Sequence, residues 1–382
     1  MKIGIDVRSL LEREAGGISV YAEKIIEHLI RIDAHNEYLL FSNSYKNSQA
    51  LINNKFSKSN AELKFFSYPN KILNASFRFL NQPKIDKMLG GVDLFFEPNI
   101  IFMALSQIPK KVITLHDLSF LLYPNLYSAK GRFWHQVINV RKVVGQFDKI
   151  IAVSDHTRND IIELLNVPPD KVQRIYPGID HEFYRNVGEE GKNNIIRKYH
   201  LPEKYVLSLA ALEPRKNIEM VIEAFAEFAK KSDCQLVLAG ASQGSELQID
   251  RLILKYGISD KVHILGYIPN EDKPALYQLA KCFVYPSFYE GFGFPPLEAM
   301  SSGTPVIASY SSSLSEICGN SALLIDPHNI GELTEAFRQV LNDNRFSDKL
   351  AQRGKVQAEK FTWEKSARET LDLFQNLAQN NQ

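Results

Sequence analysis

Cysteine is scarce in this chain, and an excess of one charge is absent. The three cysteines, Cys234, Cys282 and Cys318, are widely spaced and form no CxxC pair. This spacing supports neither a zinc site nor a disulfide framework, and it is typical of a protein in a reducing compartment. Lys and Arg number 45 and Asp and Glu 44, a net charge of +1. A dedicated nucleic-acid-binding protein shows a basic excess, so we expect no nucleic-acid partner.

Long hydrophobic runs are also absent. No stretch approaches the roughly 20 apolar residues of a membrane-spanning helix. The opening MKIGIDVRSL is a short apolar strand ending in charged residues, and it lacks the apolar core of a signal peptide. We therefore expect a cytoplasmic protein. Peripheral contact with the inner face of the cytoplasmic membrane stays open as an alternative. With 382 residues, 45% of them hydrophobic, the chain can bury two cores, which predicts two domains.

Short apolar runs recur along the whole chain, with helix-length segments between them. Each run is too short for a helix and is rich in Val, Ile, Leu and aromatic residues, which predicts a buried strand. Strands that alternate with helices, such as the one expected over 218–231, predict an α/β fold with parallel sheets covered on both faces. The predicted strands are 2–6, 38–42, 63–68, 92–98, 111–118, 149–155, 172–178, 205–210, 235–240, 262–268, 282–287, 305–309 and 322–326.

The strand series is interrupted by a polar, charged stretch over 180–203, and a new series starts at Tyr205. We therefore predict two doubly wound Rossmann-like domains, 1–185 and 186–362, facing each other across a cleft. The final helix, 363–382, is expected to pack back on the first domain. Ligands of such sheets bind at the carboxyl ends of the strands, so the site residues are sought there.

The stretch FYEGFGFPPLEAM (288–300) follows one of these predicted strands. Gly291 and Gly293 allow backbone conformations that other residues avoid, and they let a ligand approach closely. The prolines that follow predict the first turn of a short helix, whose free N–H groups would attract an anion such as a phosphate. Glu298 falls in the first turns of that helix and could reach sugar hydroxyls, while Glu290 precedes the turn. A surface loop with a capping glutamate is the alternative.

A second stretch, LAALEPRKNIEM, places Arg215 and Lys216 just after the first strand of the second domain. Two fixed cations there would neutralise a diphosphate and stabilise it as a leaving group. Asn217 is expected to cap the following helix. An Arg-Lys pair on the solvated surface is the alternative.

The first domain offers weaker candidates. Gly16 and Gly17 lie between the first strand and a helix, but a diglycine is not the GxGxxG of a dinucleotide site. His116 follows another predicted strand, although a lone histidine is more often structural. Ser154, or the neighbouring Asp155, is first of all a helix cap.

The segment EGFGFPPLEAMSSGTPVIAS (290–309) resembles the E-x7-E signature of retaining glycosyltransferases of family 4, which have the GT-B fold. The resemblance extends over nearly the whole chain. It implies an N-terminal acceptor domain and a C-terminal domain for the nucleotide-sugar donor. In that family the second glutamate, here Glu298, holds the ribose hydroxyls, and the first, here Glu290, lies against the donor sugar. Backbone groups of the turn help hold the donor, which implies binding roles for Gly291, Phe292, Gly293, Phe294 and Leu297.

The same resemblance assigns the diphosphate to Arg215 and Lys216, and contact with the donor sugar to His116. It places the Gly16-Gly17 loop near the donor phosphates and the acceptor. The loop with Tyr267 and Ile268 would frame the nucleotide base through its backbone. One departure is visible, because some members carry Gly-Arg where this chain has Leu209-Ala210 or Ala210-Ala211. We therefore expect the phosphate clamp to rest on Arg215 and Lys216 alone.

The implied reaction is transfer of a hexose, with retention of configuration, to a hydroxyl of a glycan or lipid-linked oligosaccharide in surface polysaccharide or lipopolysaccharide biosynthesis. The opening of the chain resembles mannosyl- and rhamnosyl-transferring members, so GDP-mannose leads, with dTDP-rhamnose, UDP-GlcNAc and other UDP-sugars as alternatives. No Asp cluster resembles a metal site, so we expect a metal-independent enzyme without a cofactor. A GT-B epimerase and a non-catalytic sugar-nucleotide binder compete with this interpretation. The acceptor, the linkage and the oligomeric state stay open.

The segment 129–149 combines basic residues with Phe133 and Trp134. It predicts an amphipathic helix. Such a helix either carries an ordinary solvated basic side or docks on an anionic membrane surface.

Overall fold

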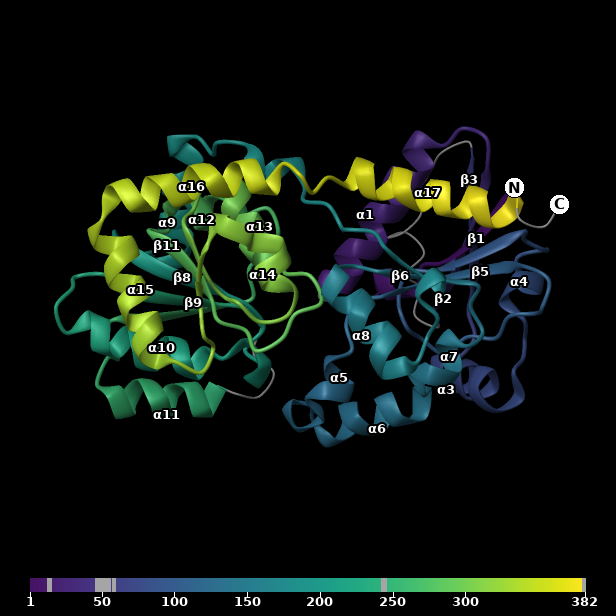
Figure 1. Ribbon diagram of the computed structural model, residues 1–382, viewed down its shortest axis with the longest axis horizontal. Helices are drawn as coiled ribbons and strands as arrows, with labels where there is room; N and C mark the ends of the chain where they lie inside the picture. Colours follow the sequence, from purple (N-terminus) through teal and green to yellow (C-terminus); the bar gives the residue numbers. More distant parts are fainter. Residues whose placement is uncertain (12–15, 45–55, 57–59, 242–245, 380–382) are drawn as a thin grey trace. The chain divides into compact units, whose positions relative to one another are not determined.

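The computed structural model describes residues 1–11, 16–44, 56, 60–241 and 246–379. The chain divides into two compact units, which are coloured along the sequence in Figure 1. Unit 1 comprises Met1–Gly178 and Thr362–Gln382, and unit 2 comprises Ile179–Phe361. The chain thus passes from unit 1 to unit 2 a few residues before the expected boundary at 185. Each unit is a parallel sheet with helices on both faces, which confirms the predicted α/β class with two Rossmann-like domains.

Unit 1 contains a seven-stranded sheet in the order β3-β2-β1-β4-β5-β6-β7. Every pair of neighbouring strands is parallel. The central strands are mainly apolar, with charged residues at their ends, because helices cover both of their faces. The strands are β1 (Lys2–Asp6), β2 (Glu37–Asn43), β3 (Ala61–Phe66), β4 (Leu94–Glu97), β5 (Lys110–Leu115), β6 (Lys149–Ala152) and β7 (Val172–Arg174).

The last helix of the chain belongs to unit 1. Figure 1 shows α17 beside α1, on the opposite side of the sheet from α6, α7 and α8. Trp363 on α17 packs against Tyr21 on α1 with ring centroids 6.0 Å apart, and Phe374 packs against Phe96 of β4 at 5.3 Å. The helices of unit 1 are α1 (Gly17–Ile32), α3 (Asn70–Ala75), α4 (Ile85–Met88), α5 (Ser119–Leu122), α6 (Ala129–Ile138), α7 (Val140–Val144), α8 (Asp155–Leu165) and α17 (Trp363–Gln379).

Unit 2 contains a six-stranded parallel sheet in the order β10-β9-β8-β11-β12-β13. The strands are β8 (Tyr205–Leu209), β9 (Gln235–Ala239), β10 (Val262–Gly266), β11 (Cys282–Tyr285), β12 (Val306–Ser309) and β13 (Leu323–Ile325). The helices are α9 (Glu189–Tyr199), α10 (Ile218–Ala229), α11 (Glu246–Tyr256), α12 (Lys273–Leu279), α13 (Phe294–Ser301), α14 (Ser313–Cys318), α15 (Ile330–Asn342) and α16 (Asn344–Ala358).

The expectation of one amphipathic helix over 129–149 is wrong. The helix breaks at Asn139, which has a φ of 53°, and the segment forms α6 and α7 instead. Asparagine tolerates this left-handed conformation better than most residues. Its side chain then accepts a hydrogen bond from the Lys142 backbone N–H and caps α7.

Within the described ranges, no helix is both long and apolar enough to cross a membrane.

Both sheets have a point where the strand order reverses. In unit 1 it lies between β1 and β4, and in unit 2 between β8 and β11. Connections leave such a point toward opposite faces of the sheet, which opens a crevice at the carboxyl ends of the two strands. The crevice of unit 2 is bordered by the segments that follow β8 and β11, which carry most of the predicted site residues.

Candidate active site

The loops that follow β8 and β11 are tied together in unit 2. The Phe288 N–H donates to the carbonyl of Arg215 at 3.0 Å. In return, Arg215 Nη1 donates to the carbonyl of Tyr289 at 2.8 Å. These bonds give the two motifs one fixed geometry, although some 70 residues separate them in the sequence.

Glu290 binds both predicted cations. Lys216 Nζ lies 2.6 Å from Glu290 Oε1, and Arg215 Nη1 lies 3.0 Å from Oε2. The hydroxyls of Tyr285 and Ser287 also donate to Oε1, at 3.0 and 2.6 Å. Only 7% of Glu290 and 9% of Lys216 is exposed. The alternative of an Arg-Lys pair on the solvated surface is therefore wrong.

The cluster fixes the charges of its members. Burial alone would raise the pKa of Glu290, but the charges of Arg215 and Lys216 and the hydrogen bonds it accepts lower that pKa to about 2. Burial and the neighbouring Arg215 lower the pKa of Lys216, and Glu290 opposes this shift. The Glu290 carboxylate therefore stabilises the charged form of Lys216 next to Arg215 within a buried site.

Lys216 retains one N–H for a ligand. Its ammonium group has three donors. One is directed at Glu290 and a second at the Tyr285 hydroxyl, at 2.8 Å. In the part of the chain that the structure describes, the third has no partner. Glu290 and Tyr285 thus orient the one remaining N–H of Lys216.

The glycine turn between Glu290 and α13 is built on specific contacts. Gly293 has a φ of 110°, and a Cβ at this position would lie 2.7 Å from Leu314 Cδ2, so only glycine fits. The Glu290 N–H donates to the Ser312 hydroxyl at 2.7 Å. The Ser313 hydroxyl lies 2.9 and 2.8 Å from the carbonyls of Glu290 and Phe292 and shares its one proton between them. Ser312 and Ser313 therefore fix the backbone of the turn.

The start of α13 offers fewer donors than the sequence suggested. The helix begins at Phe294, and the two residues that follow, Pro295 and Pro296, have no N–H. Among the first four residues of α13, only Phe294 and Leu297 therefore have a backbone N–H. The Leu297 side chain is fully buried, so this residue can contribute only its backbone. We expected several N–H groups at the start of this helix. The two prolines reduce that number, which corrects the expectation.

Glu298 lies on α13 and is held by a buried tyrosine. The Tyr277 hydroxyl donates to Glu298 Oε2 at 2.9 Å, and burial raises the pKa of Tyr277 well above its usual value, so it stays a donor. No hydrogen bond within the described ranges engages Oε1. One carboxylate oxygen is thus fixed by the protein and the other is left for a ligand hydroxyl.

Asn217 does not cap α10 as expected. It occupies the N-cap position with a φ of 58°, but its side chain makes no capping bond. The amide donates instead to the carbonyls of Pro286 and Pro327, at 3.2 and 2.7 Å. The residue therefore fastens the Arg215–Lys216 turn to the loop after β11.

Tyr267 and Ile268 follow β10, which lies two strands away from β8. Tyr267 is 47% exposed, whereas Ile268 is buried. Gly266 has a φ of 70°, which turns the chain there. Ile268 can therefore offer only its backbone to a ligand, while the Tyr267 ring is accessible.

The first-domain candidates lie together at the carboxyl edge of the unit 1 sheet. Gly16 precedes α1, Gly17 begins it, and Tyr21 of the same helix packs edge-on against His116 at 4.8 Å. His116 Nε2 lies 2.9 Å from the carbonyl of Pro98, which requires a proton on that nitrogen and leaves Nδ1 as an acceptor. Burial lowers the pKa of His116, which favours the neutral ring. At the next strand end, the Ser154 hydroxyl caps α8 by accepting from the Thr157 N–H at 3.0 Å, as expected.

Sequence reasoning missed the residues that support the two glutamates. Tyr285 is the last residue of β11, and Tyr277 lies on α12, where aromatic residues normally indicate core packing. Their ring positions are indeed buried, and only the hydroxyls reach the glutamates. A tyrosine at the end of a strand that leads into a charged motif was the available signal for Tyr285.

Metal ligands do not cluster in the described part of the chain. No group of three or more His, Cys, Asp or Glu side chains is arranged there to hold a metal ion. The cations of the buried cluster in unit 2 are Arg215 and Lys216.

Two Rossmann-like units of this kind define the GT-B class of glycosyltransferases. The family model described as "Glycosyltransferase Family 4" matches residues 15–183, and "Glycosyl transferases group 1" matches residues 192–357. The O-antigen chain mannosyltransferase B of Escherichia coli is 31% identical over 287 residues, which cover 74% of both chains. The chain therefore belongs to glycosyltransferase family 4 and resembles its mannosyltransferases.

Other known proteins agree with this assignment. The serotype-specific mannosyltransferase WbdA of E. coli is 34% identical over 280 residues. The match covers 72% of this chain but only 34% of WbdA, so the chain corresponds to about a third of that protein. The structure of a sucrose-phosphate synthase from Thermosynechococcus elongatus superimposes with a TM-score of 0.77 over 99% of both chains, at 20% identity. This likeness shows the shared fold.

Proposed function

We propose that this glycosyltransferase moves mannose from GDP-mannose, with retention of configuration, to a hydroxyl of a glycan or a lipid-linked oligosaccharide in surface polysaccharide biosynthesis. The observation that carries the proposal is the buried cluster of Arg215, Lys216 and Glu290 at the switch point of unit 2. Glu290 pairs with both cations, and Glu213 lies 3.6 Å from Arg215 Nη2 on the more exposed side. The third N–H of Lys216 is the charged donor that suits a diphosphate, which departs with increased negative charge.

The proposed reaction needs no residue that changes its protonation state. The bond between the anomeric carbon and the phosphate oxygen breaks, and the acceptor oxygen bonds to the anomeric carbon on the same face. The proton of the acceptor hydroxyl passes to the departing phosphate oxygen. Arg215 and the remaining N–H of Lys216 stabilise the diphosphate, while Glu290 keeps both cations in place. In this proposal Glu290 acts mainly through the cations, since four donors already occupy its oxygens.

The other predicted residues complete the donor site. Glu298 would accept from the ribose hydroxyls through Oε1, and the backbone of Gly291–Phe294 would bind phosphate. His116 would accept a sugar hydroxyl at Nδ1. The mannosyl donor is supported by both E. coli relatives, which are O-antigen chain and serotype-specific mannosyltransferases.

The reaction is proposed to be independent of metal and cofactor, because the two cations can supply the charge that a divalent ion gives elsewhere. Activity should persist after treatment with EDTA. A loss that manganese restores would contradict this part of the proposal.

The experiment compares GDP-mannose with UDP-glucose, UDP-GlcNAc and dTDP-rhamnose. Thermal shift identifies the nucleotide that stabilises the protein, since a ligand of the folded state raises apparent stability. Release of nucleoside diphosphate with a polysaccharide acceptor then measures transfer, and NMR of the product gives its anomeric configuration. An isomeric nucleotide-sugar would identify an epimerase. Binding without release of diphosphate would identify a non-catalytic binder, and preference for a UDP- or dTDP-sugar would replace mannose.

A further inference from the structure

Two segments of unit 1 carry no acidic residue. Residues 67–85 and 118–147 contain neither Asp nor Glu, although the chain as a whole has nearly equal numbers of acidic and basic residues. The first segment includes α3 and the turn that follows it, and the second includes α5, α6 and α7. We call the surface of these two segments the acid-free face.

Large apolar side chains are concentrated on the acid-free face. Among the described residues, eighteen large hydrophobic side chains are exposed, and nine of them lie in these two segments. Phe133 and Phe79 are 67% and 77% exposed. A concentration of exposed apolar side chains on one part of a protein marks an interaction site. The nine are Tyr68, Ile72, Phe79, Leu80, Leu121, Leu122, Tyr123, Phe133 and Trp134.

Basic side chains accompany these apolar ones. Lys130 and Arg132 precede Phe133 on α6, and Arg141 and Lys142 lie on α7. Lys71 is exposed on α3. Within the described residues, none of these five forms an ion pair with a carboxylate, so their charges are not neutralised by the protein. Uncompensated positive charge beside exposed aromatic and aliphatic groups is complementary to an anionic lipid surface.

The two segments are joined in the folded unit. Arg78 Nε donates to the carbonyl of Val137 at 3.0 Å, which connects the turn after α3 to the end of α6. Beneath the surface, the His135 ring stacks on Phe120 with centroids 4.0 Å apart, which fixes α6 on α5. Phe133 and Trp134 are thus presented from an anchored helix.

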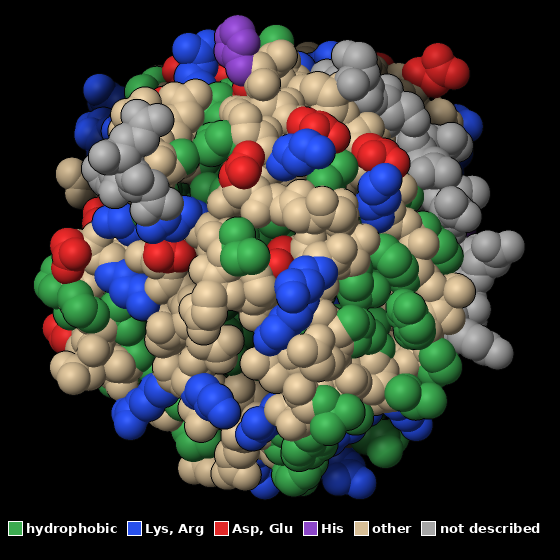
Figure 2. Space-filling view, turned by 90° about the vertical axis from the view of Figure 1, so that its right-hand side faces the viewer, with side chains coloured by type: hydrophobic (Ala, Val, Ile, Leu, Met, Phe, Trp, Pro, Cys, Tyr) green, Lys and Arg blue, Asp and Glu red, His purple; other side chains and the backbone are tan. Residues whose placement is uncertain are grey.

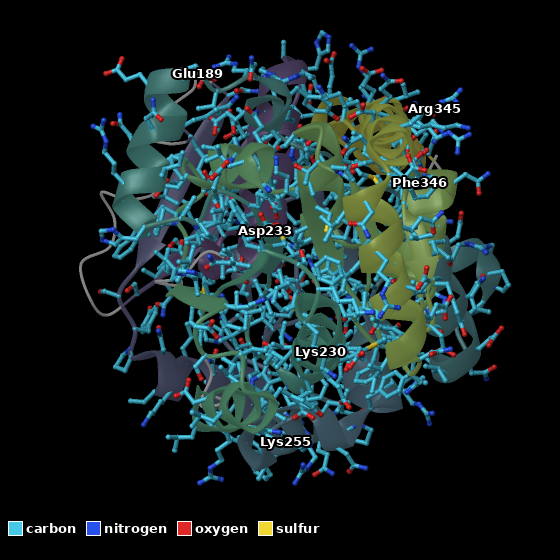
Figure 3. The ribbon with its side chains drawn as sticks, turned by 90° about the vertical axis from the view of Figure 1, so that its left-hand side faces the viewer. Glu189, Lys230, Asp233, Lys255, Arg345 and Phe346 are labelled. Atoms are coloured by element: carbon cyan, nitrogen blue, oxygen red, sulfur yellow. The ribbon has the colours of Figure 1, made fainter. Side chains whose placement is uncertain are left out.

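A face of unit 1 and a face of unit 2 differ in the distribution of their charged side chains. Figure 2 shows a face of unit 1 whose lower part carries hydrophobic and basic side chains among other atoms, with the acidic ones mainly above. In Figure 3, a face of unit 2 carries charges of both signs, including Glu189, Lys230, Asp233 and Lys255. Mixed charge is typical of a solvated surface.

We propose that the acid-free face binds anionic lipid bilayers peripherally, with Phe133 and Trp134 in the headgroup region and the basic residues against lipid phosphates. This proposal concerns unit 1 alone and does not depend on the donor or on the transfer reaction. It extends the sequence-based alternative for 129–149 to a second segment and to a defined set of side chains.

The first test uses vesicle sedimentation of the full chain at low salt. Vesicles that contain phosphatidylglycerol should bind the protein, and pure phosphatidylcholine should bind it poorly. The double variant Lys130→Gln/Arg132→Gln should weaken binding about 30-fold, because each basic residue near an anionic surface contributes about fivefold. Phe133→Ser should also weaken binding. Leu254→Ser is the matched control, since Leu254 is 70% exposed on α11 of unit 2.

A second measurement locates the contact. The chain has two tryptophans, Trp134 and Trp363, and only 3% of Trp363 is exposed. Lipids with brominated chains should therefore quench Trp134 fluorescence, and Trp134→Phe should abolish quenching while the protein still sediments with the vesicles. Equal binding to both kinds of vesicle, or binding that resists the Lys130 and Phe133 variants, would overturn the proposal. A dimer that dissociates in Phe133→Ser, without vesicle binding by the wild type, would assign the face to a second copy of the chain.

Discussion

Lys216 Nζ and Glu290 Oε1 lie 2.6 Å apart in the interior of unit 2. The first residue follows β8 and the second follows β11, and both are almost completely buried. A buried carboxylate that meets two cations stabilises them only if the remaining lone pairs are also satisfied, as the Tyr285 and Ser287 hydroxyls do here. The two motifs are therefore one unit, and a change in either should affect the other.

Replacement of Lys216 by methionine tests the role of its charge. Methionine keeps the apolar stem but removes the donor to the leaving diphosphate. We expect kcat to fall about 100-fold or more, because a donor aimed at developing negative charge typically contributes that much. The affinity for the nucleotide-sugar should change much less. Lys198→Met is the control, because Lys198 is a partly exposed lysine of the same unit whose ion pair with Asp272 lies outside the cluster. An unchanged kcat in Lys216→Met would show that the assigned role is wrong.

Tyr285→Phe removes one hydroxyl from the cluster and keeps the aromatic ring. The hydroxyl accepts from Lys216 and donates to Glu290, so its loss frees the ammonium group to turn. We expect kcat to fall about tenfold, the scale of one hydrogen bond to a charged group, with little change in KM for the donor.

Tyr205→Phe is the matched control for Tyr285→Phe. Its buried hydroxyl donates to the carbonyl of Leu276 at 2.7 Å, outside the cluster. Both variants should lose similar stability in thermal unfolding, while only Tyr285→Phe loses turnover. Equal turnover in the two variants would limit Tyr285 to a structural role.

The fold could be predicted from the sequence because its signal is local. Every predicted strand is present. A strand that is covered on both faces is a short apolar run, so it can be recognised from its own residues without knowledge of its neighbours in the sheet. The break at Asn139 was missed, because a left-handed residue inside an amphipathic pattern leaves the apolar spacing almost unchanged.

The site could be predicted only in part, because its geometry depends on contacts between distant segments. Glu290, Arg215 and Lys216 were found from their motifs, but their mutual bonds were not. Local patterns also misled at Asn217, whose amide reaches Pro286 and Pro327 instead of capping its own helix. A hydroxyl such as that of Tyr285 gives no periodic signal at all.

Tyr277 should position Glu298 for nucleotide binding. We expect Glu298→Ala to raise the Kd of the nucleoside diphosphate about tenfold or more, and Tyr277→Phe to raise it a fewfold. Because Tyr277 would act through Glu298, the hydroxyl should have no further effect in the Glu298→Ala background. Isothermal titration calorimetry of the four proteins measures this cycle, and additive effects would show that Tyr277 acts independently. Tyr285→Phe should leave the same Kd nearly unchanged.

Acid stability should reveal the charge of Glu290. Its pKa is about 2 in the folded protein, against an ordinary value of 4.5. A lowered folded-state pKa stabilises the protein fully above the unfolded value, and this contribution is lost as pH falls from about 4.5 to about 2. The free-energy difference between wild type and Glu290→Gln should therefore be constant above about pH 5 and shrink below it, by about 3 kcal/mol at most.

Urea unfolding at a series of pH values measures this difference, with circular dichroism reporting both units. Both tryptophans, Trp134 and Trp363, belong to unit 1, so their fluorescence provides an internal control for the unit without Glu290. The fluorescence transitions of wild type and variant should respond alike to acid, because groups common to both proteins cancel. The free-energy difference measured by circular dichroism could instead stay constant from neutral pH down to about pH 3. In that case the cations do not hold Glu290 ionised, and the charge assigned to the cluster is wrong.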